Sequence, residues 1–128
     1  MDYKFPNDLK YTVTHEWIRI EGEEAIIGIT EFAQGELGDI VFIEIETKGE
    51  ILEKGEIFGA IEAVKTVSDL FMPVSGDIIK INDKLEEKPD MVNKDPYGEG
   101  WLIKVKIDDV EQVNNLLDAE SYKKMIEV

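Results

Sequence analysis

Lys65 is the residue whose surroundings best suit covalent chemistry. It follows Val64 and precedes Thr66 and Val67, so it lies in β-favouring sequence whose two flanks can form strands. A lysine near the tip of such a hairpin projects its amine outward on a flexible stem, where an enzyme could attach a prosthetic group through an amide bond. On these residues alone, an ordinary surface lysine that protects a β edge is the better interpretation.

The other side chains that usually carry catalysis are scarce. The sequence has no cysteine and a single histidine, His15. These counts exclude a disulfide framework and a cysteine nucleophile, and they argue against a histidine-based metal site or a catalytic triad. We therefore expect no catalytic residue and no metal. If the protein takes part in redox or transfer chemistry, the reactive group should come from outside the twenty amino acids.

Acidic residues dominate the charge balance. There are 29 Asp and Glu residues against 14 Lys and Arg, which gives a net charge of −15. Nucleic-acid binding needs clustered Lys and Arg, so we expect no nucleic-acid partner. The charge favours steering toward basic partner surfaces, although from charge alone a solvated acidic surface is the preferred interpretation.

No segment predicts a membrane span or a secretion signal. No run approaches the ~20 consecutive apolar residues that a spanning helix needs. The first residues, Met1 to Pro6, lack the basic and apolar regions of a signal peptide. We expect a cytoplasmic protein without membrane contact, or a processed form whose presequence is missing.

Length and patterning predict one domain of many short strands. The chain has 128 residues, 43% of them hydrophobic, which is enough for a single core. Apolar runs at 17–20 and 25–29 flank a polar turn and predict a hairpin. Further strands are expected at 39–47, 57–61, 78–81 and 101–107. In the first of these, Val41, Ile43 and Ile45 should share one face.

Helices are expected in two places. Thr30 is a candidate N-cap for a short helix that Gly35 and Gly38 end. Near the C-terminus the apolar spacing becomes helical, which predicts a helical segment at about 109–127, with a second helix that begins at Asp118 or Ala119.

Blocks of residues along most of the chain resemble the glycine cleavage H-protein family. They include His15-Glu16-Trp17, Gly28-Ile29-Thr30-Glu31-Phe32-Ala33-Gln34, Leu37-Gly38-Asp39-Ile40-Val41-Phe42, Glu62-Ala63-Val64-Lys65, Ser68-Asp69, Pro73-Val74-Ser75-Gly76, Val92-Asn93, Pro96-Tyr97-Gly98, Gly100-Trp101 and Leu116-Leu117. Ordered blocks of this extent are far more specific than one lysine motif. The resemblance therefore reverses the interpretation of Lys65.

The resemblance implies a fold and a set of site residues. The fold is mainly β with terminal helices, a flattened barrel-sandwich hybrid of the lipoyl- and biotinyl-domain type, formed by residues 1–128 as one domain. Lys65 matches the lysine that carries covalent lipoate. Glu62 and Gly76 match positions associated with recognition by the lipoylating enzyme, a lipoate ligase or a lipoyl or octanoyl transferase.

Two acidic residues match family positions near the lipoyl arm. Our hypothesis is that Glu16 and Asp69 help to hold the aminomethylated arm by charge-assisted contact with its amine. The alternative is that both are solvated carboxylates in turns, and the sequence does not favour either interpretation.

The implied function is that of a non-catalytic carrier in glycine catabolism and one-carbon metabolism. The arm receives the aminomethyl group of glycine on glycine decarboxylase (P protein), delivers it to aminomethyltransferase (T protein) and is reoxidised by dihydrolipoyl dehydrogenase (L protein). A shuttle that docks on several enzymes is expected to be a monomer. The alternatives are a lipoyl relay that donates lipoate to 2-oxoacid dehydrogenases, a biotin carrier, an unmodified binding module and, least consistent with the lone histidine, an enzyme.

Overall fold

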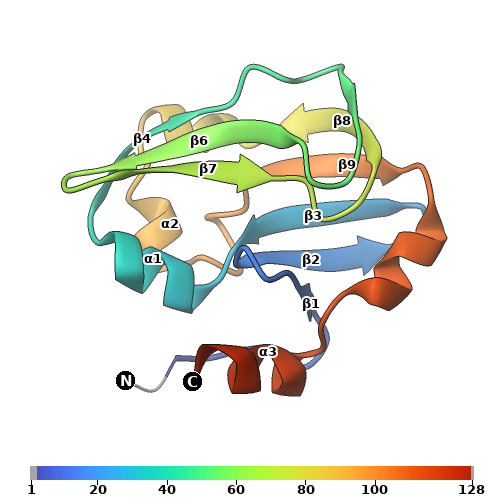
Figure 1. Ribbon diagram of the computed structural model, residues 1–128. Helices are drawn as coiled ribbons and strands as arrows, with labels where there is room; N and C mark the ends of the chain where they lie inside the picture. The colour runs from blue at the N-terminus through green and yellow to red at the C-terminus, as the bar shows by residue number, and fades with distance from the viewer. Residues whose placement is uncertain (1–2, 128) are drawn as a thin grey trace.

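The computed structural model describes residues 3–127 as two β-sheets surrounded by short helices (Figure 1). Met1, Asp2 and Val128, which belong to the predicted domain, lie outside the described residues. The strands are β1 (Lys10–Tyr11), β2 (Glu16–Glu21), β3 (Glu24–Ile29), β4 (Ile40–Glu44), β5 (Ile51–Leu52), β6 (Ile57–Ala63), β7 (Val67–Phe71), β8 (Gly76–Ile81) and β9 (Ile103–Ile107). The helices are α1 (Glu31–Leu37), α2 (Met91–Lys94) and α3 (Ala119–Ile126), with 3-10 helices η1 (Asp83–Glu86) and η2 (Val110–Asn115).

The two sheets share one apolar core. The larger sheet has the strand order β1-β2-β3-β9-β8-β5 and the smaller sheet has the order β4-β6-β7, with antiparallel pairing throughout. Ile27, Ile78 and Val105 from the larger sheet and Phe58 and Ile61 from the smaller sheet belong to the same buried cluster. Burial of these branched and aromatic side chains between the sheets supplies the main driving force for the fold. The predicted mainly β fold is confirmed.

The predicted hairpin at 17–29 is present as β2 and β3, and its packing depends on a glycine. Gly28 lies opposite Trp17 in the register of the two strands. A β-carbon on Gly28 would lie only 2.6 Å from the Trp17 indole ring, so glycine leaves the space that the ring occupies. The buried indole nitrogen Nε1 donates to the Pro96 carbonyl oxygen at 2.9 Å.

Two local predictions were wrong. Val41 is 48% exposed and does not share a buried face with Ile43. The register between β4 and β6 shifts between Ile40 and Phe42, and this β-bulge changes the direction of the side chains that follow it. Gly35 lies within α1 and does not end it. The helix ends before Gly38, whose φ of 79° is a positive value that glycine adopts readily.

The C-terminal segment is helical in two pieces. The first piece, η2, is a 3-10 helix, and Asp118 is the N-cap of the second piece, α3, where its side chain accepts from the Ser121 backbone at 2.8 Å. In α3, Ala119 and Tyr122 join a second apolar cluster with Leu9, Tyr11 and Trp17. Within residues 3–127, no helix has the length and apolar character needed to cross a membrane.

The side chain of Asn93 joins α2 to α1 and β4. Its Oδ1 accepts from the Ile40 backbone N–H at 3.0 Å. Its Nδ2 donates to Gln34 Oε1 and to the Gly38 carbonyl oxygen, both at 2.9 Å. These three bonds fix the end of α1 relative to the beginning of β4.

Asn93→Ala should lower the free energy of unfolding by about 2–3 kcal/mol, because the three bonds are lost and the Ile40 N–H is left without a partner. Urea unfolding followed by circular dichroism measures this change. Asn114→Ala is the matched control: Asn114 is exposed and its side chain makes no hydrogen bond to the described residues, so the change should stay below about 0.5 kcal/mol. Equal losses in the two variants would contradict the structural role of Asn93.

Candidate functional site

Lys65 lies in the exposed turn between β6 and β7. The turn is closed by a hydrogen bond from the Ala63 N–H to the Thr66 carbonyl oxygen at 2.8 Å. A second bond, from the Val64 N–H to the Asp39 carbonyl oxygen at 3.0 Å, ties the turn to the residue before β4. The Lys65 amine makes no ion pair with any residue between 3 and 127. The amine is thus accessible, while the backbone that carries it is held in place.

Gly38 makes room for the stem of Lys65. Its φ of 79° and ψ of −153° belong to a region that residues with a β-carbon rarely adopt. A β-carbon at this position would lie 3.6 Å from Lys65 Cε and 4.0 Å from Nζ, so the lysine stem passes over Gly38. The preceding residue, Leu37, lines a cleft beside α1. Lys65 does not line the cleft, but its stem lies beside Gly38, which follows the lining residue Leu37 in the chain.

The cleft is apolar along its walls and acidic in its charged groups. It has a volume of about 340 Å³ and is bounded by α1, β7 and the residues around the beginning of β2. Phe32 and Leu70 are among its apolar lining residues. Its charged lining residues are Glu16, Glu36 and Asp69, and no Lys or Arg of the described chain lines it. Such a cleft suits a cationic group on an apolar stem.

Glu16 is a buried carboxylate with an unequal distribution of hydrogen bonds. It lies in β2 and is only 1% exposed. Its Oε1 accepts from the Thr12 hydroxyl at 2.6 Å and from the Thr14 hydroxyl, whereas Oε2 has only the Phe71 N–H, at 3.4 Å. Burial raises the pKa of Glu16 above its ordinary value, and the hydrogen bonds oppose this effect. Oε2 therefore retains the capacity to accept a further donor.

Asp69 lines the same cleft as Glu16. It is an exposed residue of the edge strand β7. The structure thus brings together the two acidic residues that the sequence singled out. Neither of them lies in a turn, and Glu16 is not solvated.

Glu62 and Gly76 lie outside the cleft and in different sheets. Glu62 is exposed on β6, three residues before Lys65, and pairs across the sheet with Phe42 and Val67. Gly76 is buried at the beginning of β8, where a β-carbon would lie 2.6 Å from the Lys106 carbonyl oxygen. Gly76 therefore permits the close approach of β8 to β9, whereas Glu62 faces solvent beside the hairpin.

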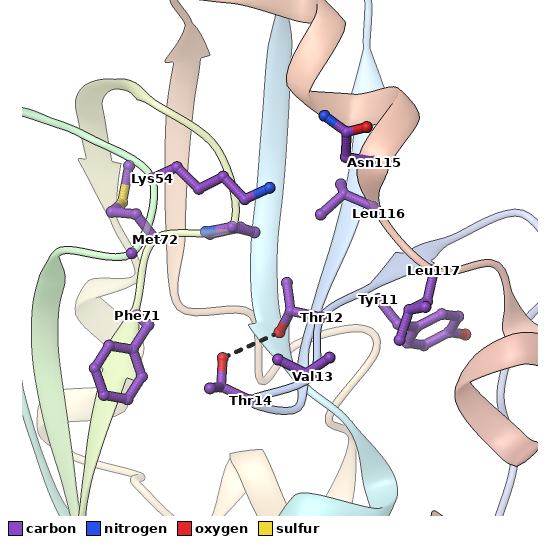
Figure 2. Close-up of a pocket in the computed structure, with 12 residues that line it drawn as sticks. Tyr11, Thr12, Val13, Thr14, Lys54, Phe71, Met72, Asn115, Leu116 and Leu117 are labelled. Atoms are coloured by element: carbon purple, nitrogen blue, oxygen red, sulfur yellow. Dashed lines mark hydrogen bonds between the residues drawn. The ribbon is translucent and has the colours of Figure 1, made fainter. Parts of the chain in front are cut away.

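A second cavity shares Thr14 with the cleft. It has a volume of about 370 Å³ and is mostly apolar, with Phe71, Met72 and Leu116 among its lining residues. Figure 2 shows Thr12 and Thr14 on one wall, with their hydroxyl oxygens joined by a hydrogen bond of 3.2 Å. None of the five site residues predicted from the sequence lines this cavity. The acidic cleft, which Glu16 and Asp69 line, is therefore the candidate site.

The strained backbone at His15 was not predicted from the sequence. Its φ of 74° is in the left-handed region, which costs a residue with a β-carbon roughly 1–2 kcal/mol. Two backbone bonds hold this conformation: the His15 N–H donates to the Thr12 oxygen at 3.2 Å, and the Thr30 N–H donates to the His15 oxygen at 3.1 Å. Strain of this kind often marks a functional position. No local pattern in the sequence signals it.

Comparison with known proteins decides the family. Residues 9–128 match the family model described as glycine cleavage H-protein. The chain belongs to the glycine cleavage H-protein family. It is 60% identical over 122 residues to the glycine cleavage system H protein of Bacteroides fragilis, a match that covers 95% of this chain and 97% of the relative. It is 51% identical over 121 residues to the H protein of Staphylococcus carnosus, with 94% and 96% covered.

A solved structure of this family shares the fold. The crystal structure of a glycine cleavage system H protein from Mycobacterium marinum superposes with a TM-score of 0.88 at 38% identity, and covers 97% of this chain and 100% of that chain. The predicted hybrid barrel-sandwich of the lipoyl-domain type is thus confirmed. Family membership also confirms the predicted role: a non-catalytic carrier that bears lipoyl-lysine and works with the P, T and L proteins.

Thr14→Val should raise the pKa of Glu16 further, because it removes a hydrogen bond that favours the charged carboxylate. Carbon-13 NMR titration of the Glu16 carboxyl group measures this pKa. A raised pKa in the folded state means that the contribution of Glu16 to stability is present below the unfolded pKa and is lost as the pH rises through the folded pKa. Ser68→Ala, which changes another lining residue without a bond to Glu16, is the control. An unchanged pKa in Thr14→Val would show that the hydroxyl does not stabilise the carboxylate.

Proposed function

We propose that Lys65 is the residue that carries the lipoyl group, and that the acidic cleft receives the loaded end of the arm. The observation that carries this proposal is an accessible amine whose stem lies beside Gly38, the neighbour of the cleft residue Leu37. The charged lining residues of this cleft are all carboxylates. The lipoyl group supplies the sulfur chemistry that accepts and releases the aminomethyl group. The residues of this chain present the amine, shield the cargo from water and hold its charge.

Three properties of Lys65 support its role as the attachment residue. The side chain is exposed, which lets an enzyme acylate the amine. It has no ionic partner in the part of the chain that the structure describes, so acylation leaves no carboxylate unpaired. The backbone of the turn is held at both Ala63 and Val64, so the arm swings from a fixed point.

The surface beside the hairpin supports a role for Glu62 in recognition by a lipoate ligase or a lipoyl or octanoyl transferase. Glu62 lies between Phe42, which is 50% exposed, and Val67, which is 61% exposed. An acidic group between exposed apolar side chains offers an enzyme both a charge and a contact surface. For Gly76 we propose an indirect contribution through the packing of β8 on β9, because the residue is buried.

We also propose that residues 1–128 act as one carrier domain and as a monomer in the cytoplasm. A monomer leaves the hairpin and the cleft open to each of the P, T and L proteins in turn. The carrier must share a compartment with these three enzymes. Attachment to a protein that docks on each of them raises the effective concentration of the arm at every active site.

Lys65→Arg should abolish lipoylation, because the guanidinium group keeps the charge but is not acylated by the same enzyme. Intact-mass spectrometry after incubation with lipoate, ATP and a lipoate ligase measures the added lipoyl mass. Lys54→Arg is the matched control, since Lys54 is another exposed lysine, and it should gain the lipoyl mass like the unaltered chain. Lipoyl mass on Lys65→Arg, or none on the unaltered chain, would reject the assignment.

Glu16→Gln combined with Asp69→Asn should speed loss of the aminomethyl group from the isolated loaded carrier by about tenfold, because charge-assisted contacts with the amine are removed. Release of ammonia and formaldehyde over time measures this rate. Alanine at both positions should act in the same direction. Glu44→Gln removes an exposed carboxylate that does not line the cleft, and it should leave the rate unchanged. Unchanged decay in the double variant would defeat the retention hypothesis.

A further inference from the structure

Among the described residues that line the cleft, His15 is the only one whose side chain can become positively charged. Its half-buried ring lies against Phe32 of α1, with ring centroids 5.2 Å apart, and against Tyr122 of α3, at 5.8 Å. The charged groups that share the cleft with His15 are Glu36 of α1, Glu16 of β2 and Asp69 of β7. A proton on this imidazole would therefore place the only positive charge in an otherwise acidic cleft.

A chain of hydrogen bonds connects His15 to the beginning of α1. Tyr122 Oη lies 2.8 Å from His15 Nδ1 and 2.8 Å from Thr30 Oγ1. Thr30 and Tyr122 are both completely buried, so water does not complete these bonds. Thr30 Oγ1 also accepts from the Ala33 N–H at 3.1 Å as the N-cap of α1.

The direction of this chain follows from the hydrogen atom of the Thr30 hydroxyl. Within residues 3–127, Tyr122 Oη is the only acceptor in hydrogen-bonding geometry with that hydroxyl. Thr30 therefore donates to Tyr122, and Tyr122 donates to His15 Nδ1. An imidazole nitrogen that accepts a hydrogen bond carries no proton, so the proton of His15 is on Nε2.

The charged imidazolium does not fit the same arrangement. With a proton on Nδ1, His15 would have to donate to Tyr122. If Tyr122 accepted from Thr30 as well, its own buried hydrogen would have no acceptor among the described residues; otherwise Tyr122 would donate to Thr30. In that second case the buried hydroxyl hydrogen of Thr30 would be left without an acceptor. Either arrangement leaves one buried donor without a partner, which is unfavourable.

We propose that Thr30 and Tyr122 are positioning residues that hold His15 as the neutral imidazole with its proton on Nε2, so that the cleft stays free of positive charge where it receives a cationic cargo. The inference about cargo rests on the function proposed above for the cleft. The inference about the imidazole depends only on the buried hydrogen bonds.

The titration behaviour of the two rings agrees with this geometry. Burial lowers the pKa of His15 below its ordinary value, although the nearby Glu36 carboxylate opposes the effect. Burial also raises the pKa of Tyr122 to about 12, so its hydroxyl keeps the hydrogen that it donates to His15.

Nitrogen-15 NMR of the unmodified protein tests the state of the imidazole directly. Because the chain has a single histidine, labelling with ¹⁵N-histidine gives the signals of one ring only. We expect an unprotonated Nδ1 and a protonated Nε2 at pH 7.5, and a His15 pKa below that of a free histidine side chain. A protonated Nδ1, or an equal mixture of the two neutral forms, would overturn the inference even if no variant folds.

Tyr122→Phe removes the hydroxyl that donates to Nδ1, so the pKa of His15 should rise and the preference for the Nε2 proton should weaken. Tyr11→Phe is the matched control: Tyr11 is buried in the same cluster and stacks on Tyr122, but its hydroxyl donates to the Pro6 carbonyl oxygen. The control should leave the imidazole signals unchanged. If it shifts them as much as Tyr122→Phe does, a general packing change explains the result and the proposal fails.

Retention of the aminomethyl group tests the consequence for cargo. At pH 6, Tyr122→Phe should lose the group about fivefold faster than the unaltered carrier, because a larger fraction of His15 is charged and repels the amine. At pH 8 the two rates should agree, since the imidazole is neutral in both proteins. Equal acceleration at both pH values would indicate a structural defect and contradict the positioning role.

The double variant Glu16→Gln with Asp69→Asn separates the two proposals. If it retains cargo like the unaltered carrier at both pH values, the amine does not lie in the cleft. The proposed function of the cleft then fails together with the cargo effect of His15. The imidazole spectrum still decides whether Thr30 and Tyr122 fix the position of the proton.

Discussion

Two backbone hydrogen bonds hold the turn that presents Lys65, the residue we propose as the attachment point. The bond from Ala63 to Thr66 closes the turn, and the bond from Val64 to Asp39 anchors it to the strand beside it. Backbone bonds of this kind fix the point from which a flexible side chain starts without restricting the side chain itself. The mobility that a carrier requires is thereby confined to the lysine stem and whatever is attached to it. The sheet holds the backbone of the turn in place, and the length of the lysine stem allows the amine to move.

The acidic cleft combines burial with charge. A carboxylate that is taken out of water loses solvation, and Glu16 recovers part of it from two threonine hydroxyls that bind the same oxygen. Apolar walls formed by Phe32 and Leu70 keep the local dielectric low, which strengthens the attraction between a carboxylate and a cation. The net charge of −15 makes the protein as a whole acidic. The net negative charge attracts a basic partner over a long range, whereas the carboxylates of the cleft act on a cation at short range.

The strands, the helix capped by Thr30 and the hairpin at Lys65 could be predicted from the sequence, because each depends on neighbouring residues. The signals were alternation, a capping side chain and β-favouring residues on both sides of Lys65. The family resemblance supplied the pairing of Glu16 with Asp69, which the periodicity of the chain does not contain. The bulge at Val41 could not be predicted, since it depends on the register with β6. The burial of Glu16 and the contacts of His15 were missed for a similar reason. They depend on residues that only the folded chain brings near.

The bond between His15 and Tyr122 joins residues 107 positions apart. The sheet that carries Lys65, in contrast, is built from strands between residues 40 and 71. Contacts between distant residues form late, because the loop between them must first be closed. During synthesis on the ribosome, the hairpin has all the strands of its own sheet once the middle of the chain has emerged, although its core partners in β9 follow later. The cleft wall beside His15 is completed only when the last helix follows.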